Sequence, residues 1–132
     1  MFTTEGNGMY RPRMLLAVAN SAYAAECGRY FRRNGWEVHV VVDGAEFQQQ
    51  VELYCPGVLV LDAALVDDSA RLFWDEWLED QGGLKVVLIV PKQDAKARQL
   101  QEILHASAMV AENDPVEKLA EAILGHRLAQ AV

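Results

Sequence analysis

Short apolar runs alternate with longer amphipathic segments along most of the chain. The runs are rich in aliphatic and β-branched residues and have the length of strands: Met14–Val18, Trp36–Val42, Val58–Leu61, Lys85–Val90 and Ala108–Ala111. A continuous apolar run is typical of a strand whose two faces are both buried. The third run is followed directly by Asp62.

The segments between these runs carry apolar residues at helical spacing. Ser21–Asn34 has its apolar positions at i, i+3, i+4 and i+7, namely Ala24, Cys27, Gly28 and Phe31. Four further helices are predicted: one that opens at Asp43-Gly44 and closes before Cys55-Pro56, one over Ser69–Asp80, one over Asp94–Ala106, and one with Asp114 as its N-cap and Pro115 at its first position.

Strands that alternate with helices predict right-handed crossovers and a parallel sheet covered on both faces. Residues 1–13 are polar and have no periodicity, so we expect a flexible N-terminal tail before a single domain over 14–132. In such sheets functional groups gather where the strands end at their carboxyl edge. Asn20, Asp62 and Glu112 each follow a predicted strand and are expected at that edge.

Composition narrows the possible functions. The chain has 132 residues, of which 52% are hydrophobic and 23% charged, the balance of one globular domain. Its net charge of -7 disfavours nucleic-acid binding, because an acidic surface repels phosphate. No apolar run approaches the ~20 residues that span a bilayer, and no signal-peptide pattern is present, so we expect a cytoplasmic protein. Cys27 and Cys55 are expected to be buried, reduced thiols.

Two stretches carry a resemblance to a known family. Residues 55–62 read Cys-Pro-Gly-Val-Leu-Val-Leu-Asp, and residues 114–119 read Asp-Pro-Val-Glu-Lys-Leu. Together with Val42-Asp43-Gly44, they resemble the CheY-like receiver domain of two-component response regulators. The resemblance implies a flavodoxin-like three-layer α/β sandwich, with a five-stranded parallel sheet of order 2-1-3-4-5 and helices on both faces.

The family's phosphorylation chemistry places Asp62 at the phosphoacceptor position. In receivers an acidic pair after the first strand helps the acceptor Asp to bind Mg²⁺. A Thr or Ser after the fourth strand and a Lys after the fifth then hold the phosphoryl oxygens, and an aromatic residue on the fifth strand reports phosphorylation. The matching positions here depart from that pattern. They are Ala19 and Asn20 for the acidic pair, or Asn20 and Ser21 if the register shifts by one, with no carboxylate in either case. Val90 stands for the hydroxyl, Met109 for the aromatic and Glu112 for the Lys.

These departures all weaken the same chemistry. Mg²⁺ prefers carboxylate oxygen, and Asn20 is a poor partner for Asp62 in binding it, so both are weak metal candidates. Glu112 would repel an incoming phosphoryl group, since like unit charges ~4 Å apart cost several kcal/mol near a surface. The sequence therefore predicts a degenerate pseudo-receiver that signals through protein–protein contacts, with no enzymatic activity and no cofactor.

Two alternatives stay open at this point. One is a functional single-domain response regulator that is phosphorylated at Asp62 with Mg²⁺ as cofactor. The other is a module that binds a ligand or cation at the acidic carboxyl edge, where Asp67, Asp68 and Asp114 could join Asp62 and Glu112. We favour solvent-exposed loop charges for Asp67 and Asp68, since acidic residues are stabilising before a helix.

The resemblance also points to a partner surface on the fourth helix, fifth strand and fifth helix. Its polar residues are Lys96, Arg98, Gln99, Glu102, Lys118, Glu121 and Arg127. This mixed-charge face can form ion pairs with a protein of a phosphorelay-type pathway, or with a second copy of the chain in a homodimer. Trp74 and Trp77, three residues apart on one predicted helix, are expected in the core rather than in an interface.

Overall fold

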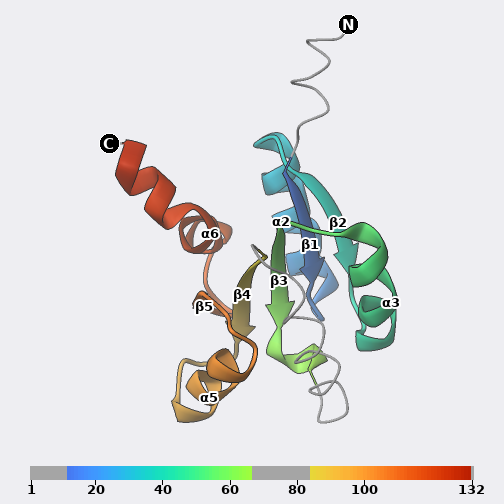
Figure 1. Ribbon diagram of the computed structural model, residues 1–132, viewed down its shortest axis with the longest axis vertical. Helices are drawn as coiled ribbons and strands as arrows, with labels where there is room; N and C mark the ends of the chain where they lie inside the picture. The colour runs from blue at the N-terminus through green and yellow to red at the C-terminus, as the bar shows by residue number, and fades with distance from the viewer. Residues whose placement is uncertain (1–11, 67–83, 132) are drawn as a thin grey trace, which may run out of the picture.

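The computed structural model describes residues 12–66 and 84–131 (Figure 1). Its strands are β1 (Arg13–Ala17), β2 (Glu37–Val41), β3 (Val58–Asp62), β4 (Lys85–Val90) and β5 (Ala108–Ala111). Its helices are α2 (Ser21–Arg33), α3 (Gly44–Tyr54), the 3-10 turn η1 (Ala63–Leu65), α5 (Ala95–Ile103) and α6 (Val116–Ala131). The predicted helix over Ser69–Asp80, with Trp74 and Trp77, lies outside the described residues, as do Asp67 and Asp68.

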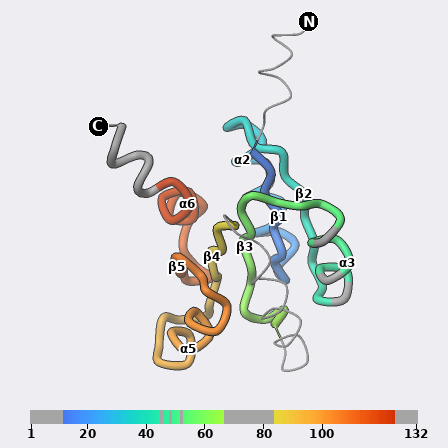
Figure 2. Tube along the Cα trace, in the orientation of Figure 1, coloured from blue at the N-terminus to red at the C-terminus, as the bar shows by residue number. Residues whose placement is uncertain are grey.

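The five strands form one parallel sheet in the predicted order, β2-β1-β3-β4-β5. Figure 2 follows this order from β2 at one side of the sheet to β5 at the other. Ala17 pairs with Val41 of β2 and with Leu61 of β3, and Asp62 pairs with Ile89 of β4. The carboxyl ends of the central strands are therefore level at one edge of the sheet.

Alternate residues of each strand pack against different helix layers. Met14 and Leu16 of β1 belong to the core under α2 and α6. Leu15 and Ala17 belong to the core under α3 and α5. Burial of both faces explains why the strands read as continuous apolar runs and confirms the three-layer sandwich. The predicted α2 stripe is also confirmed, since all four of its members are buried: Ala24, Cys27, Gly28 and Phe31.

Three local predictions were wrong. Cys55 is exposed, because it ends α3 in a left-handed conformation, with φ 51°, where the chain turns at the surface. The Asp114 carboxylate does not cap α6 but accepts a hydrogen bond from the Ala111 N–H at 3.0 Å, because a tight turn after β5 brings the two residues together. The fourth helix ends at Ile103 rather than Ala106, since His105 adopts a left-handed conformation with φ 54°.

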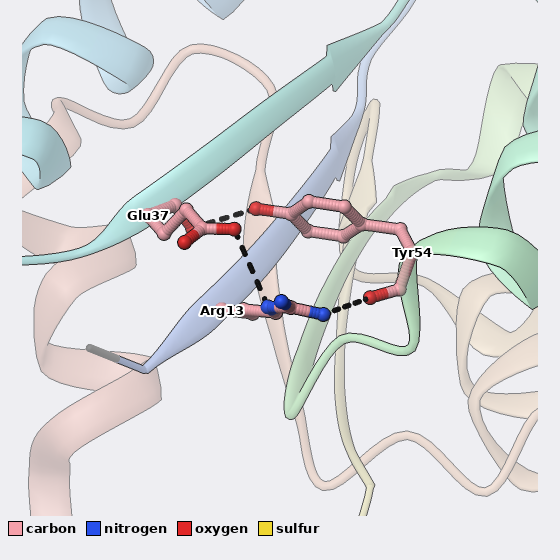
Figure 3. A network of polar contacts seen from close by, with 3 residues as sticks. All are labelled: Arg13, Glu37 and Tyr54. Atoms are coloured by element: carbon pink, nitrogen blue, oxygen red, sulfur yellow. Dashed lines mark hydrogen bonds and ion pairs between the residues drawn. The ribbon is translucent and has the colours of Figure 1, made fainter. Parts of the chain in front are cut away.

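A polar network ties three elements together at the amino edge of the sheet (Figure 3). Arg13 Nη1 donates to the Tyr54 carbonyl at 3.0 Å, and its Nε lies 3.3 Å from Glu37 Oε2. The Tyr54 hydroxyl donates to the Glu37 carbonyl at 3.1 Å. Burial raises the pKa of Tyr54 to about 12, and the nearby Glu37 carboxylate acts in the same direction. These contacts attach the end of α3 to β1 and β2, at the edge opposite Asp62.

Candidate functional site

Asp62 lies at the carboxyl end of β3, as predicted, and only 7% of it is exposed. It is the one buried side chain with a charge in the described part of the chain. Its Oδ1 accepts a hydrogen bond from the Ala64 N–H at 3.0 Å, which caps η1. Its Oδ2 accepts one from the Ala19 N–H at 3.1 Å. Both oxygens of the buried carboxylate are thus bonded to backbone amides, the pairing that a buried charge requires.

The segment that follows β1 faces Asp62 through its backbone and not through its side chains. Ala19 supplies the N–H, and its methyl side chain can offer nothing to a cation. Asn20 is the N-cap of α2, and its Oδ1 accepts from the Tyr23 N–H at 3.1 Å. The amide oxygen predicted as a weak metal ligand is therefore used to begin a helix.

The ends of β4 and β5 complete the edge. Val90 is 1% exposed and packs in the core under α3 and α5, and Met109 is partly buried against the same core. Glu112 is exposed, and its N–H donates to the Val90 carbonyl at 2.8 Å. The structure thus brings the segments of Ala19, Asp62, Val90 and Glu112 to one edge, whereas Met109 lies within β5, paired with Leu88.

Among residues 12–66 and 84–131, the donors around Asp62 are a poor fit to Mg²⁺. A magnesium ion takes six oxygen ligands in near-octahedral geometry. In the described part of the chain, Asp62 offers a single carboxylate whose two oxygens already accept amide hydrogens. No group of three or more His, Cys, Asp or Glu side chains arranged for a metal occurs among residues 12–66 and 84–131. Asp114, considered for a cation site, is bonded to Ala111.

A link between α2 and the loop before α6 has no signal in the sequence pattern. The Tyr23 hydroxyl donates to the Asp114 carbonyl at 3.2 Å. Burial raises the pKa of Tyr23 above its ordinary value, and burial also raises the pKa of Cys27, a neighbour of Tyr23, to about 11. Helical spacing places Tyr23 on one face of α2 but does not indicate which distant segment that face meets, so the contact with Asp114 was not predicted.

A cavity beside Val90 was also missed. It has a volume of about 550 Å³ and lies between η1, the end of β4 and the start of α5. No sequence motif predicts this cavity, because the residues that line it come from segments that are distant in the sequence.

The residues of the predicted partner surface lie on two helices that flank the edge strand β5. On α5 the four predicted residues are all exposed: Lys96, Arg98, Gln99 and Glu102. Lys118 and Glu121 are exposed on α6, and Arg127 lies within the same helix. Since α5 and α6 cover opposite faces of the sheet, this surface wraps around the β5 edge (Figure 1).

Comparison with known proteins identifies the fold. No protein-family model and no curated protein sequence matches the chain. Among solved structures, the CheY-like response regulator receiver domain protein from Methanospirillum hungatei JF-1 is 16% identical with a TM-score of 0.76, over 91% of this chain and 95% of that one. A DNA-binding response regulator of the LuxR family from Staphylococcus aureus is 17% identical with a TM-score of 0.71, over 85% and 95% of the two chains.

A third similar structure is a response regulator from Burkholderia pseudomallei with a phosphorylated aspartic acid and a calcium ion. It is 15% identical with a TM-score of 0.73, over 92% of this chain and 73% of that one. These similarities establish that the chain has the CheY-like, flavodoxin-like receiver fold. No helix in the described ranges is long and apolar enough to cross a membrane.

Proposed function

We propose that the chain is a cytoplasmic pseudo-receiver, a signalling module that acts through protein–protein contacts and does not accept a phosphoryl group at Asp62. The observation that carries this proposal is the hydrogen bond from the Ala19 N–H to Asp62 Oδ2, at 3.1 Å. Ala19 stands where the resemblance places the first of two acidic residues. An amide hydrogen, not a second carboxylate, therefore faces the acceptor oxygen.

The charges at this edge support the proposal. Phosphoryl transfer depends on positioning and on neutralising the negative charge of the transferred group. Asp62 has no carboxylate partner at Ala19 or Asn20 with which to hold a cation. The buried Val90 has no hydroxyl to donate, and Glu112 adds negative charge where the family pattern has an ammonium. We infer that neither an enzymatic activity nor a magnesium cofactor belongs to this module.

The β5 edge supports a role in docking. Ala108, Met109 and Ala111 of β5 are partly exposed, so they present a narrow apolar strip. The charged and polar residues of α5 and α6 lie on either side of it, among them Arg98 and Glu121. An apolar centre with a polar rim is the usual anatomy of a protein interface. The partner we propose is a signalling protein, and a second copy of the chain fits the same description because both charge signs are present.

Phosphate labelling tests the proposal directly. The natural protein and Asp62→Asn are incubated with radiolabelled acetyl phosphate and millimolar Mg²⁺, and incorporated label is measured after gel filtration. We expect the same background label in both proteins. Label that appears in the natural protein and is lost in Asp62→Asn would contradict the proposal. It would support the functional response regulator instead, in line with the phosphorylated aspartic acid of the Burkholderia pseudomallei protein.

The docking surface is tested separately. Arg98→Glu reverses a charge on α5, and Arg33→Glu makes the same change on α2, on the opposite layer of the sandwich. Sedimentation velocity over a range of protein concentrations measures self-association. If the β5 edge is the dimer surface, Arg98→Glu weakens the dimer and Arg33→Glu leaves it intact. Equal weakening by both variants would place the interface elsewhere.

A further inference from the structure

The cavity beside Val90 has the size of a small-ligand site. Its volume of about 550 Å³ falls within the roughly 300–1,000 Å³ of ligand pockets in proteins. It opens at the carboxyl edge of the sheet, next to the turn that Asp62 caps. The carboxyl edge is where ligands bind in open α/β sheets.

The inner wall of the cavity is apolar and held in place by the core. Val90 is buried, and Val66 and Leu100 are partly buried against the same core cluster. The family pattern has a hydroxyl at the position of Val90. In this chain the position is part of an apolar wall, which offers a surface to an apolar ligand and not to a phosphoryl group.

Among the described residues, two lysines and one aspartate line the mouth of the cavity, an excess of one positive charge. Lys92 and Lys96 line it, and both are exposed. Among the described residues, neither ammonium group lies within ion-pair distance of a carboxylate. Asp94 also lines the cavity, but its carboxylate caps α5 by accepting the Ala97 N–H at 3.0 Å. That hydrogen bond is the largest cause of the lowered pKa of Asp94, and the nearby Lys92 ammonium acts in the same direction.

We propose that this cavity binds a small amphipathic anion, with its apolar body against Val66, Val90 and Leu100 and its acidic group between Lys92 and Lys96. In a chain with a net charge of -7, two ammonium groups at the mouth of one apolar cavity select for a negatively charged ligand. This goes beyond the docking function proposed above. It needs neither phosphorylation of Asp62 nor a protein partner, so the two proposals can fail independently.

A pair of fluorescent probes tests the inference. 8-Anilinonaphthalene-1-sulfonate has an aromatic body with one acidic group, and N-phenyl-1-naphthylamine has the same body without the charge. The test variant carries Lys92→Gln and Lys96→Gln. The control variant carries Arg33→Gln and Lys118→Gln, which remove the same number of charges from α2 and α6, away from the cavity. Near-ultraviolet circular dichroism verifies that all the proteins are folded, since partly unfolded chains also bind the anionic probe.

The natural protein should bind the anionic probe saturably and more tightly than the neutral one. Each replaced lysine should lower the affinity for the anionic probe about two- to fivefold, the usual range for exposed charge pairs. The neutral probe should keep its affinity within about twofold, and only the anionic probe should bind more weakly as salt is added. Val90→Thr should lower the affinity for both probes, because it places a hydroxyl in the apolar wall.

Three results would overturn the inference. The first is no saturable binding of the anionic probe to the natural protein. The second is equal anionic affinity in the test and control variants, which would place the binding outside the cavity. The third is a loss of neutral-probe affinity as large as the loss for the anion, which would mean that the lysines only maintain the local structure.

Discussion

The carboxylate of Asp62 and the backbone N–H of Ala19 are joined by a hydrogen bond of 3.1 Å between residues that are 43 positions apart in the sequence. The bond connects the end of β3 to the loop that follows β1. The other carboxylate oxygen starts η1 through Ala64. Asp62 therefore has a structural role at the carboxyl edge of the sheet, at the position that the sequence resemblance assigns to the phosphoacceptor.

Removing this carboxylate should destabilise the fold. Asp62→Ala leaves the N–H groups of Ala19 and Ala64 without their acceptor, and we expect a loss of about 2–3 kcal/mol in the free energy of unfolding. Asp62→Asn keeps one side-chain oxygen and should lose about 1 kcal/mol. Urea denaturation at neutral pH measures both values. A change below about 0.5 kcal/mol in Asp62→Ala would mean that the two hydrogen bonds contribute little.

Rebuilding the missing groups should restore phosphorylation. Ala19→Asp, Asn20→Asp, Val90→Thr and Glu112→Lys supply the family pattern around Asp62, and an Asp at position 20 can still cap α2. We expect Mg²⁺-dependent labelling of this quadruple variant by acetyl phosphate. Its matched control adds Asp62→Asn and should not be labelled.

Added Mg²⁺ should stabilise the fold of the same quadruple variant. Three carboxylates close together repel one another, and a bound cation relieves that repulsion. We expect its melting temperature to rise with added Mg²⁺, whereas that of the natural protein stays constant. A restored variant that shows neither labelling nor a Mg²⁺ effect would mean that the departures from the family pattern extend beyond these four positions.

Tyr54 should make stability fall at alkaline pH. Its pKa is raised from 10.0 to about 12, first by burial, so the fold favours the protonated phenol. A raised pKa contributes stability that is complete below pH 10 and is lost as pH rises toward 12. Tyr54→Phe lacks this titration, although it loses the hydrogen bond to Glu37. The natural protein should therefore be the more stable one at pH 8, and its advantage should shrink between pH 10 and 12. If the free energy of unfolding changes with pH in the same way in the natural protein and in Tyr54→Phe, this prediction is wrong.

His105 should be replaceable by glycine with a gain in stability. Its φ of 54° is left-handed, and the bonds from the His105 N–H to Glu102 and from the Ala106 N–H to Gln101 form a Schellman motif at the end of α5. Glycine adopts this conformation without a steric penalty, so His105→Gly should stabilise the fold by about 0.5–1 kcal/mol. His105→Ala keeps the strained backbone and should give no gain. Thermal denaturation distinguishes the two variants.

The apolar pattern by itself determined the architecture of this protein. The succession of strands and helices along the chain and the two buried faces of the sheet follow from apolar runs and helical stripes that recur along the sequence. The order of the strands within the sheet was implied by the family resemblance. A sheet buried on both faces requires apolar side chains at successive positions, and Leu15, Leu16, Val60 and Leu88 are all fully buried in it.

Tertiary structure alone decided how the polar side chains are used. Asp114 turns back to Ala111, Asn20 caps α2, and Cys55 lies at the surface. A single polar side chain often has several possible partners, and which one it finds depends on distances between segments that no periodicity encodes. The same holds for the bond between Asp62 and Ala19 and for the cavity beside Val90. Each forms only when the folded sheet brings remote segments to a common edge.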